Sequence, residues 1–211
     1  CDGIVARVFE NNTLVDLAKY GNVPVINALC NLYHPCQAFA DFQTIAENYD
    51  DLSKVKLAYF GDGNNVTNSL LITGAKCGTD VLCVCPKGNG PDVQVYEAAL
   101  EVAKTTGAKL AVTDDPMAAK GYDVVYTDTW VSMGDNTPLD AVKAKFMPFQ
   151  INRELLENTG IKHVLHCQPA HREYEITSEV MDGPWSIIYD EAENRMHAQM
   201  AVLSTLLNQG V

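Results

Sequence analysis

Short apolar runs alternate with longer amphipathic segments along most of the chain. The runs are rich in β-branched residues and are predicted to be strands: Ile4–Val8, Val23–Ile26, Val55–Phe60, Asp80–Cys85, Lys109–Thr113, Val124–Thr127 and Lys162–His166. Segments between several of them have helical periodicity: Gln37–Asn48, Asn65–Gly74, Val93–Thr106, Leu139–Phe146 and Asn152–Thr159. Because strands that alternate with helices usually pair in parallel, the sequence predicts an α/β fold with helices on both faces of a parallel sheet.

The order of these elements divides the chain into three parts. Residues 1–50 hold two predicted strands and a helix, which we interpret as the C-terminal part of one α/β domain with its linking helix. Residues 51–185 are predicted to form a nearly complete second α/β domain, and residues 186–211 a closing helix that packs back on the first. Because the chain enters a strand almost at Cys1, we expect it to be a fragment cut within a domain.

Composition removes several classes of function. The apolar fraction of 47% supports a packed core, and no apolar run approaches the ~18 residues that a membrane span needs. A formal net charge of -12 opposes nucleic-acid binding, which depends on clustered Lys and Arg. The seven cysteines are odd in number and lie mostly in apolar segments, as reduced core thiols do. We therefore predict a cytoplasmic protein without a membrane or nucleic-acid partner.

The segment from Asp128 to Gly134 is the most informative for function. It follows the apolar run Val124–Tyr126, so it lies at the carboxyl end of a predicted strand, where open α/β sheets bind ligands. It combines a carboxylate, a hydroxyl and several backbone N–H groups, which suits an amino acid. The alternative is an ordinary strand-to-loop transition, in which Trp130 and Met133 are core residues and Asp128 caps a helix.

A glycine-containing turn follows the strand that ends at Phe60. Gly61 and Gly63 would let backbone N–H groups and a helix N-terminus approach an anion. The spacing matches half of a dinucleotide fingerprint, but Val66 replaces the third glycine, and no acidic residue ends the next strand. A turn with Asn65 as a ligand donor is therefore preferred to nicotinamide binding.

Two polar side chains near the start of the predicted helix Gln37–Asn48 are also candidates for contacts with a ligand. His34 and Gln37 are three residues apart on one face of a helix whose first turn contains Pro35. Such a His is either a buried structural residue or a ligand contact, and the sequence leaves both possibilities open.

The segment His166–Arg172 follows the last predicted strand. Its two His and one Cys lack the paired spacing of a zinc site, and neighbours on a strand point to opposite faces. A substrate contact is preferred to a metal site. Cys167 is either a nucleophile or a buried thiol. In the last segment, Glu191–Arg195, the arginine is either a solvated charge or an anion contact.

Taken in order, these motifs resemble those of the ornithine carbamoyltransferases over the whole chain. The matching segments are His34-Pro35-Cys36-Gln37, Gly61-Asp62-Gly63-Asn64-Asn65, Asp128-Thr129-Trp130-Val131-Ser132-Met133-Gly134, His166-Cys167-Gln168-Pro169 and Glu191-Ala192-Glu193-Asn194-Arg195. Asp-x-x-x-Ser-Met-Gly resembles the ornithine loop, whereas His-Pro-x-Gln is shared by carbamoyltransferases in general. The resemblance implies attack of the ornithine side-chain amine on carbamoyl phosphate, giving citrulline and phosphate.

The resemblance also implies roles for individual residues. Around the carbamoyl group and phosphate it places Arg7, His34, Gln37 and Arg195. At the amino-acid end of ornithine it places Asn65, Asp128, Ser132 and Met133, the last through its backbone. Cys167 would lie near the reacting amine. Gln168 stands where the family usually has Leu, a change we expect to be tolerated if the contact is through the backbone carbonyl.

The family's properties extend these expectations to partners and assembly. The resemblance implies carbamoyl phosphate and L-ornithine as substrates, no metal or organic cofactor, and a homotrimer or a higher multiple. Residues 1–50 would then be part of the carbamoyl phosphate domain. The 211 residues lack the family's Ser-Thr-Arg-Thr phosphate motif, so we expect them to be inactive alone. A non-catalytic ornithine-binding or assembly fragment and a nicotinamide-dependent enzyme are the alternatives.

Overall fold

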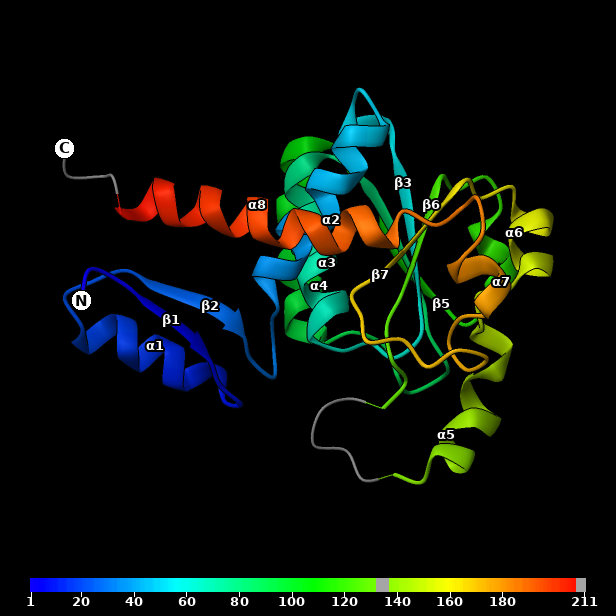
Figure 1. Ribbon diagram of the computed structural model, residues 1–211, viewed down its shortest axis with the longest axis horizontal. Helices are drawn as coiled ribbons and strands as arrows, with labels where there is room; N and C mark the ends of the chain where they lie inside the picture. Colours follow the sequence, from blue (N-terminus) through cyan, green and yellow to red (C-terminus); the bar gives the residue numbers. More distant parts are fainter. Residues whose placement is uncertain (132–136, 208–211) are drawn as a thin grey trace.

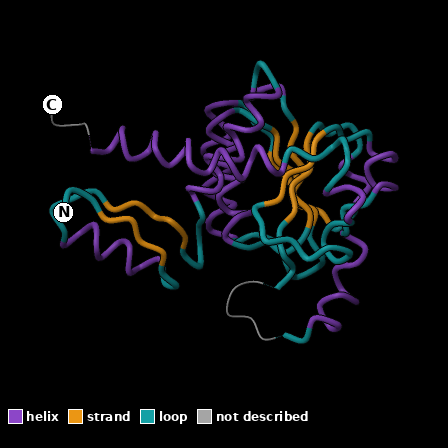
Figure 2. The backbone as a smooth tube through the Cα atoms, viewed as in Figure 1, coloured by secondary structure: helices purple, strands orange, loops and turns teal. Residues whose placement is uncertain are grey.

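A parallel sheet of five strands forms the centre of the main body (Figures 1 and 2). The computed structural model describes residues 1–131 and 137–207. The strand order is β5-β4-β3-β6-β7, and each neighbouring pair is parallel. The bounds are β3 (Lys56–Phe60), β4 (Asp80–Val84), β5 (Leu110–Thr113), β6 (Val124–Thr127) and β7 (His163–His166). The predicted α/β fold with a parallel sheet is confirmed.

Alternate residues of the strands enter two separate cores, one on each face of the sheet. In β3, Leu57 and Tyr59 enter the core beneath α2 (Pro35–Asn48), α3 (Asn65–Cys77) and α4 (Val93–Thr106). Ala58 and Phe60 enter the core beneath α6 (Arg153–Thr159) and α7 (Ser178–Met181). Burial of both faces explains why the strands are continuously apolar in sequence. Helix α5 (Leu139–Phe146) contributes Val142 and Phe146 to a separate small cluster with Trp130.

A second, two-stranded sheet lies apart from the first (Figure 1). It pairs β1 (Ile4–Arg7) with β2 (Val25–Leu29) in parallel, connected by α1 (Asn11–Tyr20). Helix α1 was not predicted from the sequence; most of its side chains are exposed, and Leu14 is the one buried residue. Strand β2 starts at Val25, two residues later than predicted, since Pro24 has no N–H to donate to the ladder. The strand ends at Leu29.

The last helix, α8 (Ile188–Leu207), joins the two parts by packing along α2. Gln43 Nε2 donates to Asn194 Oδ1 at 2.9 Å, and Asn194 Nδ2 donates to Thr44 Oγ1 at 2.9 Å. The C-terminal half of α8 then extends along the side of the small sheet (Figure 1). Within residues 1–131 and 137–207, no helix combines the length and the apolarity needed to cross a membrane.

Candidate functional site

A cavity of about 550 Å³ lies at the carboxyl ends of β3, β6 and β7 and extends to the end of β1. Seven of the residues singled out in the sequence line it: Arg7, His34, Asn65, Asp128, Cys167, Gln168 and Arg195. Gln37 contacts the cavity indirectly, because its Oε1 accepts a hydrogen bond from Arg195 Nη1. Ser132 and Met133 lie outside the described residues. The structure thus brings residues from both sheets to one concave surface.

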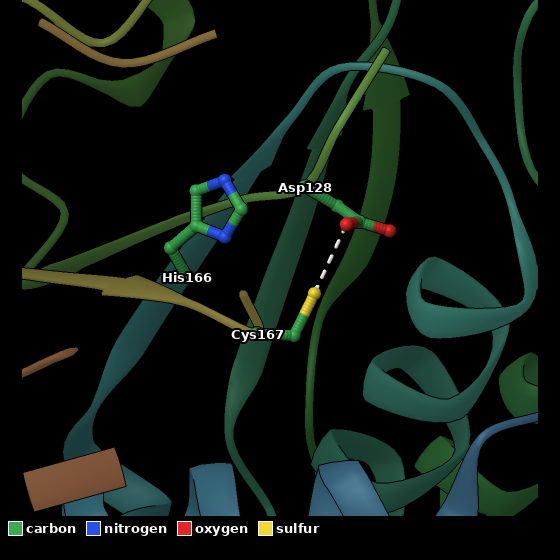
Figure 3. A group of neighbouring side chains, drawn as sticks. All are labelled: Asp128, His166 and Cys167. Atoms are coloured by element: carbon green, nitrogen blue, oxygen red, sulfur yellow. Dashed lines mark hydrogen bonds between the residues drawn. The ribbon is translucent and has the colours of Figure 1, made fainter. Parts of the chain in front are cut away.

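Asp128 is held by three hydrogen-bond donors at the end of β6. The Cys167 thiol donates to its Oδ1 at 3.0 Å, as Figure 3 shows, and the N–H of Thr129 donates to the same oxygen at 2.7 Å. Asn64 Nδ2 donates to its Oδ2 at 2.7 Å. Asp128 caps none of the helices in residues 1–131 and 137–207, since the next described helix has Pro138 at its N-cap, whereas Trp130 is a core residue that stacks on Phe146. A carboxylate held in this way is rigidly placed and faces the cavity.

Cys167 is a hydrogen-bond donor in this arrangement. Burial raises the pKa of its thiol well above the usual range, and the Asp128 carboxylate raises it further. Because the thiolate is the reactive form of cysteine, a thiol whose pKa is raised is a poor nucleophile at neutral pH. The geometry therefore favours a polarised thiol beside a carboxylate over covalent catalysis.

Asp128, His166 and Cys167 place possible metal-ligand atoms within 4.8 Å of one another. Cys167 follows directly after the last residue of β7. However, His166 Nδ1 accepts from the N–H of Gln168 at 2.9 Å, and its Nε2 lies 3.1 Å from Glu175 Oε1. With both ring nitrogens engaged, His166 positions the following turn.

Gln168 forms that turn in a left-handed backbone conformation with φ of 57°. Such a conformation is uncommon for a residue with a side chain and is often found at functional sites. The Gln168 residue lines the cavity, while its side-chain Nε2 is buried without a hydrogen-bond partner.

His34 lies at the entrance of α2 and is neutral. Its ring is buried, its Nδ1 has no hydrogen-bond partner, and its backbone N–H donates to Ser69 Oγ at 2.7 Å. Burial lowers the His34 pKa to about 3, and the positive charges of Arg195 and Arg7 contribute. A neutral imidazole between two arginines donates one hydrogen bond without adding positive charge.

Arg195 faces the cavity from α8, so its interpretation as a solvated surface charge is wrong. One nitrogen donates to Gln37 Oε1, while Nε is buried without a hydrogen-bond partner. Gln37 in turn donates from Nε2 to Asp41 Oδ1 at 2.7 Å and to Glu191 Oε1 at 3.1 Å. This chain of contacts fixes the side chains that present positive charge to the cavity.

The turn after β3 is closed to a dinucleotide. Asn64 Oδ1 accepts the N–H groups of Val66 at 2.9 Å and Thr67 at 3.2 Å, so the α3 N-terminus is capped by its own side chain. The N–H of Gly63 donates to the carbonyl of Asn89 at 2.8 Å. The backbone groups that would hold a pyrophosphate are therefore occupied, which argues against the nicotinamide interpretation.

Gly63 is required by close packing. A Cβ at this position would lie 2.1 Å from the carbonyl carbon of Gly90. We expect Gly63→Ala to lower the free energy of unfolding by about 1–3 kcal/mol, because backbone must move to relieve the overlap. The control is Gly90→Ala, whose Cβ would make an ordinary 3.7 Å contact with Val112. Equal urea midpoints for the two variants would contradict this account.

The structure also adds residues that the sequence did not single out. Asn64, rather than Asn65, contacts Asp128, while Asn65 Nδ2 donates to the carbonyl of Cys30 at 2.6 Å. His171 Nδ1 lies 3.1 Å from Thr129 Oγ1 and so bridges the loops after β6 and β7. Asn64 stands immediately before a predicted helix, which was a signal for its capping role. Nothing in the sequence pointed to the contact between His171 and Thr129.

Comparison with known proteins agrees with this architecture. Residues 1–47 match the family model for the carbamoyl-P binding domain of aspartate/ornithine carbamoyltransferase, and residues 53–206 match its Asp/Orn binding domain. Together with the α/β fold and the shared cavity, these matches define a carbamoyltransferase.

Individual relatives show which kind of carbamoyltransferase this chain is similar to. The ornithine carbamoyltransferases of Moritella profunda and Vibrio sp. (strain 2693) are each 64% identical over 206 residues, covering 98% of this chain and 68% of the relative. The solved ornithine carbamoyltransferase structure from Pyrococcus furiosus is 45% identical with a TM-score of 0.93, covering 100% of this chain and 67% of that one. The solved structure of the ornithine carbamoyltransferase from Gloeobacter violaceus is 46% identical with a TM-score of 0.90, covering 98% of this chain and 70% of that one. The chain belongs to the ornithine carbamoyltransferase family.

Proposed function

We propose that this chain supplies the ornithine side and part of the carbamoyl phosphate side of an active site that makes L-citrulline and phosphate from L-ornithine and carbamoyl phosphate. The observation that carries the proposal is the single cavity that joins Arg7 from the small sheet to Asp128 and Cys167 from the large one. A reaction between two substrates needs both to be held in one such space.

On the carbamoyl side, we assign the binding of the carbamoyl group to Arg7, His34 and Gln37. Arg195 would stabilise the negative charge that develops on the carbonyl or phosphate oxygens when the amine attacks. The neutral state of His34 suits this assignment, because its ring N–H would donate to the carbonyl oxygen of the carbamoyl group without exchanging a proton near neutral pH. Arg195 Nε is a further donor, buried without a hydrogen-bond partner.

On the ornithine side, we assign the amino-acid end to Asn65, Asp128, Ser132 and Met133, with Gln168 contributing its backbone carbonyl. The carboxylate of Asp128 attracts an ammonium group, and the donors around it keep it in place. Cys167 would lie beside the reacting amine, where its thiol and Asp128 together influence the amine's protonation. No step in this scheme requires a metal or an organic cofactor.

The wider properties of the enzyme are proposals of the same kind. We assign residues 1–50 to the carbamoyl phosphate domain and its linking helix, residues 51–185 to the ornithine domain, and residues 186–211 to the closing helix. The two family matches, which meet between residues 47 and 53, support the boundary near residue 50. We further propose a cytoplasmic homotrimer, or a higher multiple of it, that acts in arginine metabolism.

The 211 residues by themselves are expected to form no measurable citrulline. They span 68% of the length of the first curated relatives and contain no Ser-Thr-Arg-Thr phosphate motif. A colorimetric citrulline assay on the isolated chain checks this. Calorimetry should then detect weak ornithine binding and almost no binding of carbamoyl phosphate. Measurable citrulline formation by the isolated chain would refute the expectation, and the absence of ornithine binding would refute the assigned site.

A further inference from the structure

Two carboxylates, Asp41 on α2 and Glu191 on α8, lie together in the interior where these helices pack. Asp41 is 0% exposed and Glu191 is 1% exposed. Gln37 Nε2 donates to one oxygen of each, at 2.7 Å and 3.1 Å respectively. Two ionised carboxylates in this position would be costly, because burial disfavours charge and the like charges repel each other.

The charges around this pair balance if it keeps one proton. Arg195 on α8 faces it as a cation, and the Tyr126 hydroxyl on β6 and the Cys167 thiol are neutral neighbours. Burial raises the pKa of Asp41 to about 7, and burial, the charge of Asp41 and a hydrogen bond with Asp41 raise the pKa of Glu191 well above its usual range. A pair that holds one proton carries a single negative charge, which Arg195 neutralises.

The hydrogen bonds indicate which carboxyl holds the proton. Glu191 accepts through both oxygens, from Gln37 Nε2 at Oε1 and from the N–H of His166 at Oε2, the latter at 2.8 Å. Asp41 accepts through Oδ1, whereas its Oδ2 is buried without a partner. Asp41 Oδ2 is therefore the oxygen of the pair that is available to carry a proton.

The pair connects both sides of the cavity. Because the Gln37 amide group faces the two acids, its Oε1 is turned toward Arg195. Because Glu191 also accepts the N–H of His166, it holds the end of β7 one residue before Cys167. We propose that Asp41, protonated, and Glu191, ionised, are positioning residues that orient Gln37, Arg195 and the start of the Cys167 turn for carbamoyl transfer. The catalytic consequence rests on the proposed function, whereas the shared proton does not.

Kinetics of the active enzyme containing these residues test the positioning role. Asp41→Asn keeps an acceptor at Oδ1 and a donor in place of the proton, so kcat should stay within about threefold of wild type. Glu191→Gln turns an NH2 group toward the N–H of His166 or Gln37 Nε2, so kcat should fall about 100-fold while KM changes less. Asp41→Leu should resemble Glu191→Gln.

The matched control is Thr44→Val on the same helix. Thr44 is also fully buried, and its hydroxyl donates to the carbonyl of Ala40 at 2.8 Å. This variant should lose stability and keep its kcat, which separates positioning from general destabilisation. Equal losses of kcat in Asp41→Asn and Glu191→Gln would overturn the placement of the proton.

Infrared spectroscopy of the 211-residue chain tests the shared proton without any activity. A carboxylic acid C=O band should be present just below pH 7 and absent from Asp41→Asn. The folded chain keeps a proton that the unfolded chain releases at lower pH, so wild-type stability should decline as pH rises from the usual carboxyl range toward 7. Asp41→Asn should lose this decline. Absence of the band in the wild-type chain would overturn the proposal, even if the enzyme proves to be a carbamoyltransferase.

Discussion

Replacing Asp128 with asparagine is expected to weaken L-ornithine binding by about 100-fold in the active enzyme that contains these residues. The substitution removes the negative charge that faces the cavity. It also brings an NH2 group against the donors Cys167, Thr129 and Asn64, one of which must then lose its acceptor. Isothermal titration calorimetry with L-ornithine measures the change directly, and Asp128→Ala should show a loss at least as large.

Asp123→Asn is the matched control for Asp128, because the two carboxylates lie at opposite ends of the same strand. Asp123 precedes β6 and accepts the N–H of Lys56 at 3.1 Å, far from the strand end that faces the cavity. Its substitution should leave ornithine affinity unchanged. If Asp128→Ala bound ornithine as tightly as Asp123→Asn, the assignment of the loop after β6 to the substrate would be wrong.

Replacing Arg195 with methionine is expected to lower kcat by about 100- to 1000-fold, the usual effect of removing a donor that stabilises a developing oxyanion. The same change should raise the pKa of His34 from its value of about 3, since the charge of Arg195 is one of the causes that lower it. The pKa should remain below 6.5, because burial is the larger cause and persists. Steady-state kinetics and an NMR titration of His34 check the two effects.

Arg195→Lys separates charge from hydrogen bonding. Lysine keeps the positive charge, so the pKa of His34 should stay low, but one ammonium group does not reproduce the planar set of donors. We therefore expect kcat to fall without a shift in the His34 titration. Arg153→Met is the exposed control, since Arg153 pairs with Glu157 and Glu179 on the surface. A wild-type kcat for Arg195→Met would contradict the role in charge stabilisation.

Local sequence patterns were enough to find the seven strands and most helices. Runs such as Val124–Thr127 are apolar on both faces because both faces of the sheet are covered. The same argument did not find α1, where most side chains are exposed and Leu14 is the one buried residue. The closing helix was predicted within residues 186–211 and runs from Ile188 to Leu207, and Ile188 belongs to the buried core of the large sheet as well as to the helix.

The candidate residues were found at strand and helix ends, but their partners were not. Asp41 and Glu191 look in sequence like ordinary acidic residues of amphipathic helices, and their complete burial arises only when α8 packs along α2. Gly63 resembled part of a nucleotide fingerprint, whereas its neighbour in space is the backbone at Gly90. Such roles depend on segments distant in sequence and leave no local pattern.

The sequence by itself determined the order of strands and helices and the placement of polar segments at their ends, because both follow from periodicity along the chain. Only the tertiary structure decided which of those side chains meet. Asp128 and Cys167 are 39 residues apart, and Gln37 and Arg195 are 158 apart, yet each pair is joined by a hydrogen bond. The neutral state of His34 and the proposed shared proton of Asp41 and Glu191 also depend on the fold, since burial and nearby charge exist only after packing.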